Sequence, residues 1–130
     1  MVPPPIVLGL TVCEKAIVEE GTRNVTLVST FTKLFVDSFP TPPQKFTAYV
    51  VLTEGLGMGI IDLVVSSLET NREVHQRRFT IRFPDRLMEM RLVFNVTNCV
   101  FPAPGAYQLI LLLDGECLAM RRIQVVAKEK

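Results

Sequence analysis

The sequence lacks several features on which enzymes commonly depend. It has no tryptophan and a single histidine, so a catalytic site of the Ser-His-Asp or Cys-His type would have to use His75. That histidine stands beside Gln76 and Arg77 in a polar stretch, and no GxSxG nucleophile motif occurs in the chain. We interpret His75 as a solvated surface residue and expect no enzymatic activity.

Long apolar runs and an excess of one charge are missing as well. The uninterrupted apolar stretches are short, such as residues 109–113, and fall far below the ~20 residues of a membrane-spanning helix. Lys and Arg number 14 against 13 Asp and Glu, and a net charge of +1 gives no electrostatic reason to expect nucleic acid or an anionic membrane as a partner. The start, Met-Val-Pro-Pro-Pro, has neither a basic nor a long apolar segment, which predicts a cytoplasmic protein without a signal peptide.

Cysteines arranged for a disulfide framework or a metal site are also absent. The three cysteines are an odd number and form no CxxC pair: Cys13, Cys99 and Cys117. They are typical of reduced, buried thiols, and a zinc site would need His75 together with all of these distant segments, so neither a metal nor another cofactor is expected. Two Asn-x-Thr sequons, at Asn24 and Asn95, are interpreted as chance matches because no secretory signal accompanies them.

What the sequence does contain is a strong alternation of apolar and polar residues. Hydrophobic residues make up 48% of the chain, enough for one folded domain over residues 1–130. The alternation has a period of two, which is typical of half-buried strands, and turn signals recur every roughly 8–15 residues, as in a sandwich or a small barrel. About eight strands are predicted, over residues 6–13, 25–29, 47–53, 60–67, 74–83, 88–96, 107–113 and 117–126. The polar stretch 14–24 is expected to turn, and the proline-rich stretch 31–44 to be largely irregular.

The strongest local signal is the dipeptide Asp114-Gly115 between two alternating apolar runs. It is typical of a two-residue type I′ hairpin. Such a loop predicts three directly opposed pairs: Leu113 with Glu116, Leu111 with Leu118, and Leu109 with Met120. The alternation then slips where two arginines stand together, and a β-bulge at residues 121–122 would explain that slip.

This hairpin lies in a segment with a recognisable pattern. Residues 100–120 have the form FPxPGxYxxxLxLDGExLA, which resembles a family of small, functionally uncharacterised bacterial proteins and also the closing hairpin of many immunoglobulin-like domains. Residues 7–13, followed by 25–31, are similar to the opening hairpin of that family. The resemblance implies an all-β, immunoglobulin-like antiparallel sandwich, and it brings no catalytic residues with it.

Two features are candidate ligand sites. The glycine-rich segment 55–59, with Gly55, Gly57 and Gly59, precedes a predicted strand and lacks the helix and lysine of a phosphate loop, so a hairpin turn is favoured. Arg78 and Arg82 fall on one face of a predicted strand and form a possible anion patch. A solvated face paired with nearby glutamates is favoured, because the neighbouring phenylalanines point the other way. Asp62 interrupts an apolar strand, is expected to face outward, and would need a partner if it were buried.

The clearest functional lead is a second apolar face on the closing hairpin. Ile110 and Leu112 point away from the predicted core, and the predicted register pairs them with Ala119 and Cys117. The possible interface therefore comprises Ile110, Leu112, Cys117 and Ala119. Either loops or the proline-rich segment cover this face, or a second copy of the chain does. We predict a non-enzymatic protein-interaction or assembly module that self-associates through the face. The alternative is a small-ligand or anion-binding sandwich that uses segment 55–59 or the side of Arg78 and Arg82.

Overall fold

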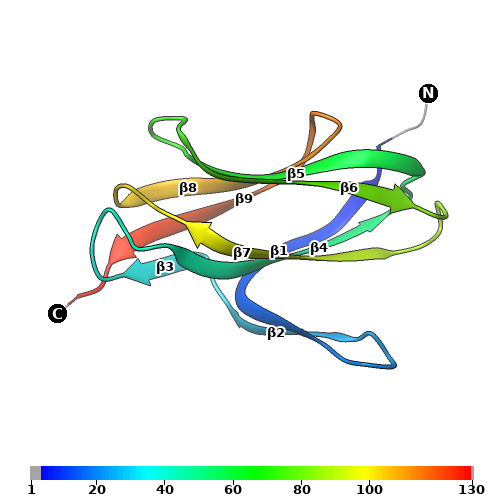
Figure 1. Ribbon diagram of the computed structural model, residues 1–130, viewed down its shortest axis with the longest axis horizontal. Helices are drawn as coiled ribbons and strands as arrows, with labels where there is room; N and C mark the ends of the chain where they lie inside the picture. Colours follow the sequence, from blue (N-terminus) through cyan, green and yellow to red (C-terminus); the bar gives the residue numbers. More distant parts are fainter. Residues whose placement is uncertain (1–3, 130) are drawn as a thin grey trace.

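In the computed structural model, every regular element of the described residues is a β-strand (Figure 1). The structure describes residues 4–129, so the first three residues of the Met-Val-Pro-Pro-Pro start, on which the signal-peptide expectation rests, lie outside the described range. Within this range, the nine strands are β1 (Ile6–Val18), β2 (Val25–Thr30), β3 (Lys33–Val36), β4 (Gln44–Thr53), β5 (Gly57–Ser67), β6 (Glu73–Phe83), β7 (Met90–Cys99), β8 (Gly105–Leu113) and β9 (Glu116–Ala127).

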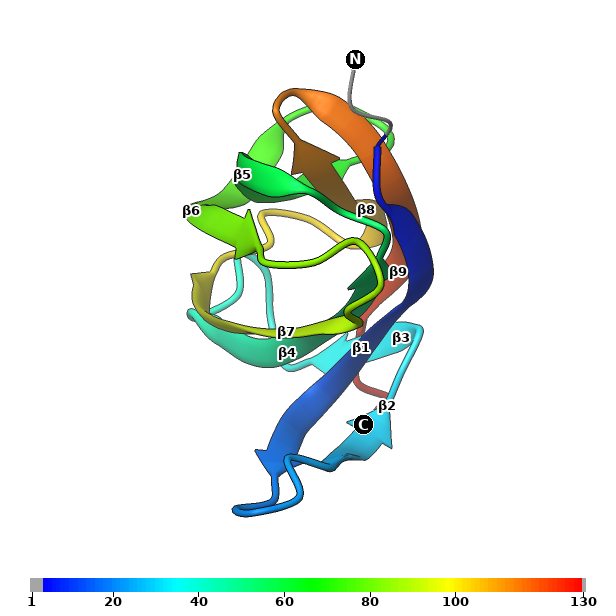
Figure 2. The ribbon, with the colours of Figure 1, turned by 90° about the vertical axis from the view of Figure 1, so that its right-hand side faces the viewer.

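The strands form two layers that face each other (Figure 2). One sheet has the order β2-β1-β4-β7, and the other has the order β3-β9-β8-β5-β6. In an immunoglobulin-like sandwich, β1, β4 and β7 correspond to strands A, B and E, and β5, β8 and β9 to C, F and G. The predicted all-β, immunoglobulin-like sandwich is therefore confirmed, with β6 added to the second sheet beside β5.

The core fills the space between the two layers and is almost entirely aliphatic and aromatic. Alternate residues of β4 and β8 point into it, because side chains along a strand alternate between the two faces. The largest fully buried side chains are Phe101, Leu52, Ile61, Leu63, Leu109, Leu111, Ile123, Val12, Val50, Val65, Val96 and Val125. No disulfide joins the layers, since all three cysteines are free. Apolar packing therefore holds the two sheets together.

A buried tyrosine fixes the connection between β7 and β8. The hydroxyl of Tyr107 donates a hydrogen bond to the carbonyl of Ala103 at 2.6 Å and accepts one from the N–H of the same residue at 3.4 Å. Its ring meets Phe101 edge to face, with the centroids 4.8 Å apart. This is the tyrosine corner of immunoglobulin-like domains, where a cysteine often stands two residues later. Here that place is taken by Leu109, which is fully buried.

The first strand is longer than predicted and carries an arm. The stretch 14–24 was expected to turn, but β1 continues to Val18, and its second half pairs with β2 instead of β4. The resulting hairpin extends away from β4 and β7, the other two strands of this sheet (Figures 1 and 2). The pairing of β1 with β4 also slips between Val7 and Gly9, which leaves Ile6 and Leu8 exposed instead of facing the core.

A ninth strand lies within the stretch that was expected to be largely irregular. β3 pairs with β9 in parallel, which is an exception at this edge to the antiparallel pairing of the predicted sandwich. Leu34 packs against the core and Val36 is buried in it, whereas Phe35 between them is 55% exposed. The same alternation that identifies longer strands is present here, but it extends over only four residues.

The closing hairpin turns at the predicted place, and its register differs from the prediction. Asp114 and Gly115 both have positive φ angles, 49° and 86°, as a type I′ turn requires. Leu113 faces Glu116 as predicted, but a bulge then follows: Leu112 pairs with Cys117, Leu111 with Ala119, Ile110 with Met120 and Leu109 with Arg121. The extra residue is Leu118, so the bulge lies nearer the turn than the arginine pair.

Candidate interaction surface

The outward side of the five-stranded sheet carries a contiguous apolar patch. Two rows of directly opposed residues cross β6, β5, β8 and β9: Gln76, Val64, Ile110 and Met120 in one row, and Arg78, Asp62, Leu112 and Cys117 in the next. We call the large apolar side chains of this side the outer apolar face: Ile60, Val64, Ile110, Leu112 and Met120. Ile60 is 44% exposed and Met120 is 59% exposed, so no loop of the described chain covers the whole patch; Ile110 and Leu112 are half-buried, and Val64 is only 7% exposed.

The bulge at Leu118 changes which residues belong to this face. Ile110, Leu112 and Cys117 lie on the outward side as predicted, and Cys117 is exposed. Ala119 was assigned to the same face, but it pairs with the buried Leu111 and therefore lies on the core side of the sheet. Met120 occupies the outward position opposite Ile110. One inserted residue moves every later side chain of the strand to the opposite face of the sheet. The local sequence around the turn does not reveal such an insertion.

An ion pair is embedded at one side of the outer apolar face. Asp62 faces outward as expected, yet it is only 6% exposed. Arg78 on β6 donates to its two carboxylate oxygens, at 2.8 Å from Nε and 3.4 Å from Nη2. These hydrogen bonds hold the pKa of Asp62 below its usual value, although burial acts in the opposite direction. A carboxylate within an apolar strand needs a partner if it is buried, so the sequence already contains a signal for this pair.

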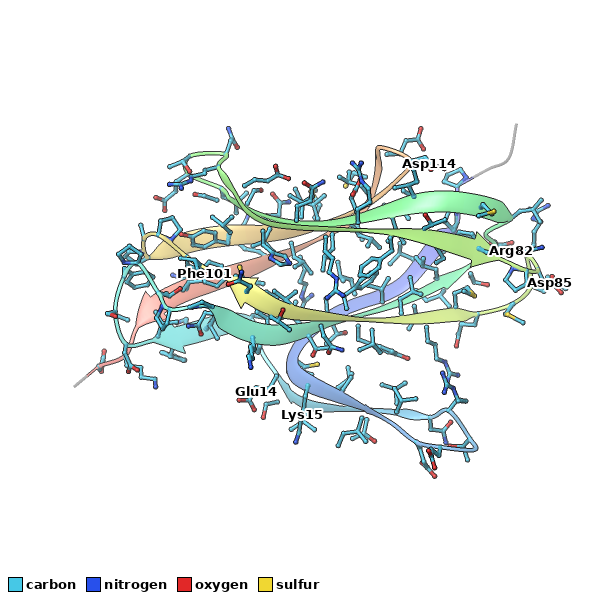
Figure 3. All side chains as sticks on the ribbon, in the orientation of Figure 1. Glu14, Lys15, Arg82, Asp85, Phe101 and Asp114 are labelled. Carbon is cyan, nitrogen blue, oxygen red and sulfur yellow. The ribbon has the colours of Figure 1, made fainter. Side chains whose placement is uncertain are left out.

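The structure does not bring the predicted anion-binding residues together. Arg78 and Arg82 share the outward side of β6, but four residues along a strand separate them by about 13 Å. The guanidinium of Arg78 is already paired with Asp62, whereas the patch was expected to pair with glutamates. In Figure 3, Arg82 lies near Asp85, towards the end of the sandwich. The pair therefore does not form a single anion site.

The glycine-rich segment borders a pocket of about 410 Å³, but its glycines are not arranged as a phosphate cradle. Gly55 is buried beneath the ring of Phe83, where an added Cβ would lie 2.3 Å from the nearest ring carbon. The carboxylate of Asp114, at the β8–β9 turn in Figure 3, accepts a hydrogen bond from the N–H of Ile60 at 2.9 Å. The N–H of Ile60 is therefore already bound by an acidic side chain of the protein and is not free to bind a phosphate. The hairpin turn that the sequence favours is nevertheless wrong here, because the segment leads from β4 to β5, which lie in different sheets, and Gly57 and Gly59 belong to β5.

The single histidine is not the solvated surface residue that the sequence suggested. His75 is half-buried, and its Nε2 atom is buried without a hydrogen-bond partner among residues 4–129. Burial lowers its pKa below the usual value of an imidazole, which favours the neutral form. Within the same residues, no cluster of three or more histidine, cysteine or acidic side chains is arranged to hold a metal ion.

The three cysteines and the two sequon asparagines differ in how far they are accessible to reaction or modification. Cys13 and Cys99 are buried as predicted, and burial raises the pKa of the Cys99 thiol to about 12. Cys117 is exposed, so the expectation of buried thiols is wrong for this residue. Asn24 lies in the turn of the arm, and Asn95 lies within β7, where its side chain accepts a hydrogen bond from the hydroxyl of Thr47 at 3.1 Å.

Comparisons with known proteins give a family without an assigned activity. A family model described as a family of unknown function (DUF6941) matches residues 8–126. Among solved structures, the chain is similar to an immunoglobulin-like protein from Pseudomonas aeruginosa, with 13% sequence identity and a TM-score of 0.44, over 96% of this chain and 98% of that one. No curated protein matches the chain. Residues 4–129 contain no helix that is long and apolar enough to cross a membrane. The family match confirms the resemblance to an uncharacterised family that residues 100–120 suggest.

Proposed function

We propose that this chain, which belongs to that family of unknown function, is a protein-interaction module that self-associates through its outer apolar face. The observation that supports this proposal is a set of large apolar side chains gathered on the solvent side of a sheet whose other side already faces the core. Removing such side chains from water releases about 25 cal/mol for each Å² of apolar surface. When both sides of a sheet are apolar, the core covers only one of them, and the outer side favours contact with a partner.

The size of the face sets the expected strength of association. Four strands span about 14 Å, and the rows from Ile60 to Ser66 extend about 20 Å along them, giving a flat area of roughly 300 Å². A standard interface buries about 800 Å² on each partner. The long polar side chains at the border must therefore contribute, including Gln76, Arg78 and Arg122. We expect a weak, reversible dimer with a dissociation constant in the micromolar range.

A second copy is favoured over an unrelated partner because the face is suited to twofold packing. Its most exposed apolar side chain, Met120, lies on β9, and the charged Arg78 lies on β6, with β8 and β5 between these two strands. If a twofold axis passes through the centre of the outer apolar face, between β5 and β8, Met120 of each copy lies near β6 of the other copy. The methionine then covers the aliphatic part of the Arg78 side chain, and the guanidinium groups remain at the border in water.

Sedimentation equilibrium over a wide concentration range tests the proposal directly. We expect the apparent mass to rise from monomer to dimer, and the variant Met120→Glu to weaken the dissociation constant at least tenfold. Leu8→Glu is the matched control, because Leu8 is 57% exposed and Met120 is 59% exposed, on different sheets. Both side chains are largely in water, so neither substitution should change the unfolding temperature by much. A wild-type protein that stays monomeric at all concentrations, or equal effects of the two variants, would disprove the proposal.

A further inference from the structure

One side of the sandwich is open between two strand edges. β6 and β7 are the last strands of their respective sheets, and they lie across from each other on the same side of the molecule (Figure 2). A slot of about 220 Å³ opens between them, lined mainly by Ile61, Phe79, Ile81, Leu92 and Phe94. The ring centroids of Phe79 and Phe94, which both line the slot, are 5.2 Å apart. The slot is large enough for one aliphatic or aromatic side chain.

Beside this slot, one edge of β7 has no neighbouring strand among residues 4–129. Arg77 on β6 donates a hydrogen bond from Nη1 to the carbonyl of Asn95 at 2.6 Å, so that carbonyl points away from β4. In an antiparallel strand, the N–H and C=O of one residue point to the same side, and alternate residues share that side. The pairing of β7 with β4 is regular from residue 90 to residue 96. The backbone groups of Arg91, Val93 and Asn95 are therefore directed to the open edge.

The groups around the slot carry positive charge. The guanidinium of Arg77 lies over the ring of Phe79, 4.8 Å from its centroid. Within residues 4–129, Arg77 forms no ion pair, whereas Arg91 is paired with Glu89. Arg77 thus uses a backbone carbonyl as its acceptor where a carboxylate would bind more strongly. A ligand with an acidic group near an apolar side chain would satisfy both the arginine and the slot.

We propose that the open edge of β7 binds an extended, acidic and hydrophobic segment of another protein as an added strand. Its backbone pairs with Arg91, Val93 and Asn95, and this main-chain pairing provides much of the affinity. One of its inward apolar side chains fills the slot, and a neighbouring carboxylate replaces the Asn95 carbonyl as the acceptor of Arg77. The site lies on the opposite sheet from the outer apolar face, so it goes beyond self-association and does not depend on it.

The test uses a defined probe, the end-blocked peptide Glu-Thr-Val-Thr-Phe-Thr-Val-Glu, titrated into the full chain and followed by NMR. We expect the amide signals of Arg91, Val93 and Asn95 and the ring signals of Phe79 and Phe94 to shift together. Two further peptides carry N-methyl groups on alternate residues, in the two possible registers. Only the register whose N–H groups face β7 should lose binding, because an added strand uses every second residue for the ladder.

A variant of the protein gives a second test. Val93→Pro removes an N–H that faces the open edge and leaves the hydrogen bonds to β4 intact, which an edge strand tolerates. It should weaken binding at least tenfold, whereas Val93→Thr, which keeps the N–H, should bind like the wild type. If the proline variant fails to fold, the N-methylated peptides still decide. Shifts that map away from β6 and β7, equal binding by both N-methylated peptides, no binding, or an edge of β7 already occupied by a second copy would each overturn the proposal.

Discussion

Replacing Tyr107 by phenylalanine tests whether the tyrosine corner holds the connection between β7 and β8. The substitution removes a single oxygen atom and keeps the ring, so the edge-to-face contact with Phe101 is retained. It deletes the hydrogen bond to the carbonyl of Ala103, which has a donor–acceptor distance of 2.6 Å, and the weaker one from the Ala103 N–H. The measured change in stability therefore reports on the hydroxyl group alone.

The expected cost follows from the surroundings of the two partners. A buried polar group that loses its hydrogen-bond partner costs about 1–3 kcal/mol. Tyr107 is 3% exposed, but Ala103 is exposed, so water can partly replace the lost donor. The lower part of that range applies, about 1–2 kcal/mol. For a domain of this size, 1 kcal/mol corresponds to roughly 3–4 °C, so the melting temperature should fall by about 3–8 °C.

Equilibrium unfolding in urea, followed by circular dichroism, measures this loss. The matched control is Tyr49→Phe, because Tyr49 is the only other tyrosine, is half-buried, and makes no side-chain hydrogen bond to the described residues. The control should stay within about 0.5 kcal/mol of the wild type, with the same dependence on urea concentration in all three proteins. If Tyr107→Phe is as stable as Tyr49→Phe, the hydroxyl does not secure the corner and the reasoning is refuted.

Three further outcomes are expected. The folded-state pKa of Asp62 lies below its unfolded value of about 3.9, so its pairing stabilises the fold above that pH. This contribution disappears as the pH falls through the folded pKa. Urea unfolding at a series of acidic pH values should therefore show a smaller loss of unfolding free energy for Asp62→Asn than for the wild type. A thiol reagent should modify Cys117 rapidly in the native protein and the two buried cysteines only after unfolding, and rapid modification of all three would contradict the burial. Gly55→Ala should cost about 1–3 kcal/mol in urea unfolding, because the added carbon meets the ring of Phe83, whereas an unchanged midpoint would mean that the ring has room to move.

The parts of the fold that depend on local chemistry could be predicted from the sequence. Asp114-Gly115 supplies the positive φ angles of a type I′ turn, and the alternation around Leu109 and Leu111 identifies a strand without any tertiary information. The bulge at Leu118 could not be predicted in this way. Its position depends on how that side chain packs against the core, and it decides whether Ala119 or Met120 lies on the outer apolar face.

Features that depend on pairing between distant segments were missed or only partly seen. The alternation showed that Ile110 and Leu112 point outward, and Asp62 signalled the need for a partner. Identifying Arg78 as that partner requires the register of β5 against β6. The slot beside β7 is even harder to predict from the sequence, because it lies between the edge strands of the two sheets. No run of residues in the sequence records which strands lie at an edge.

The parallel pairing of β3 with β9 has a consequence for the order in which the protein is made. Lys33 pairs with Gln124, about ninety residues later in the chain, so closing this contact costs roughly 4 kcal/mol of chain entropy. At about 5–20 residues per second, a ribosome needs roughly 5–18 s to add the intervening residues. During that time the exposed Phe35 and the unpaired edge of β3 have no partner within the chain. The nascent protein is therefore most open to chaperones, and to mispairing with a neighbouring copy, at the strand that completes the second sheet.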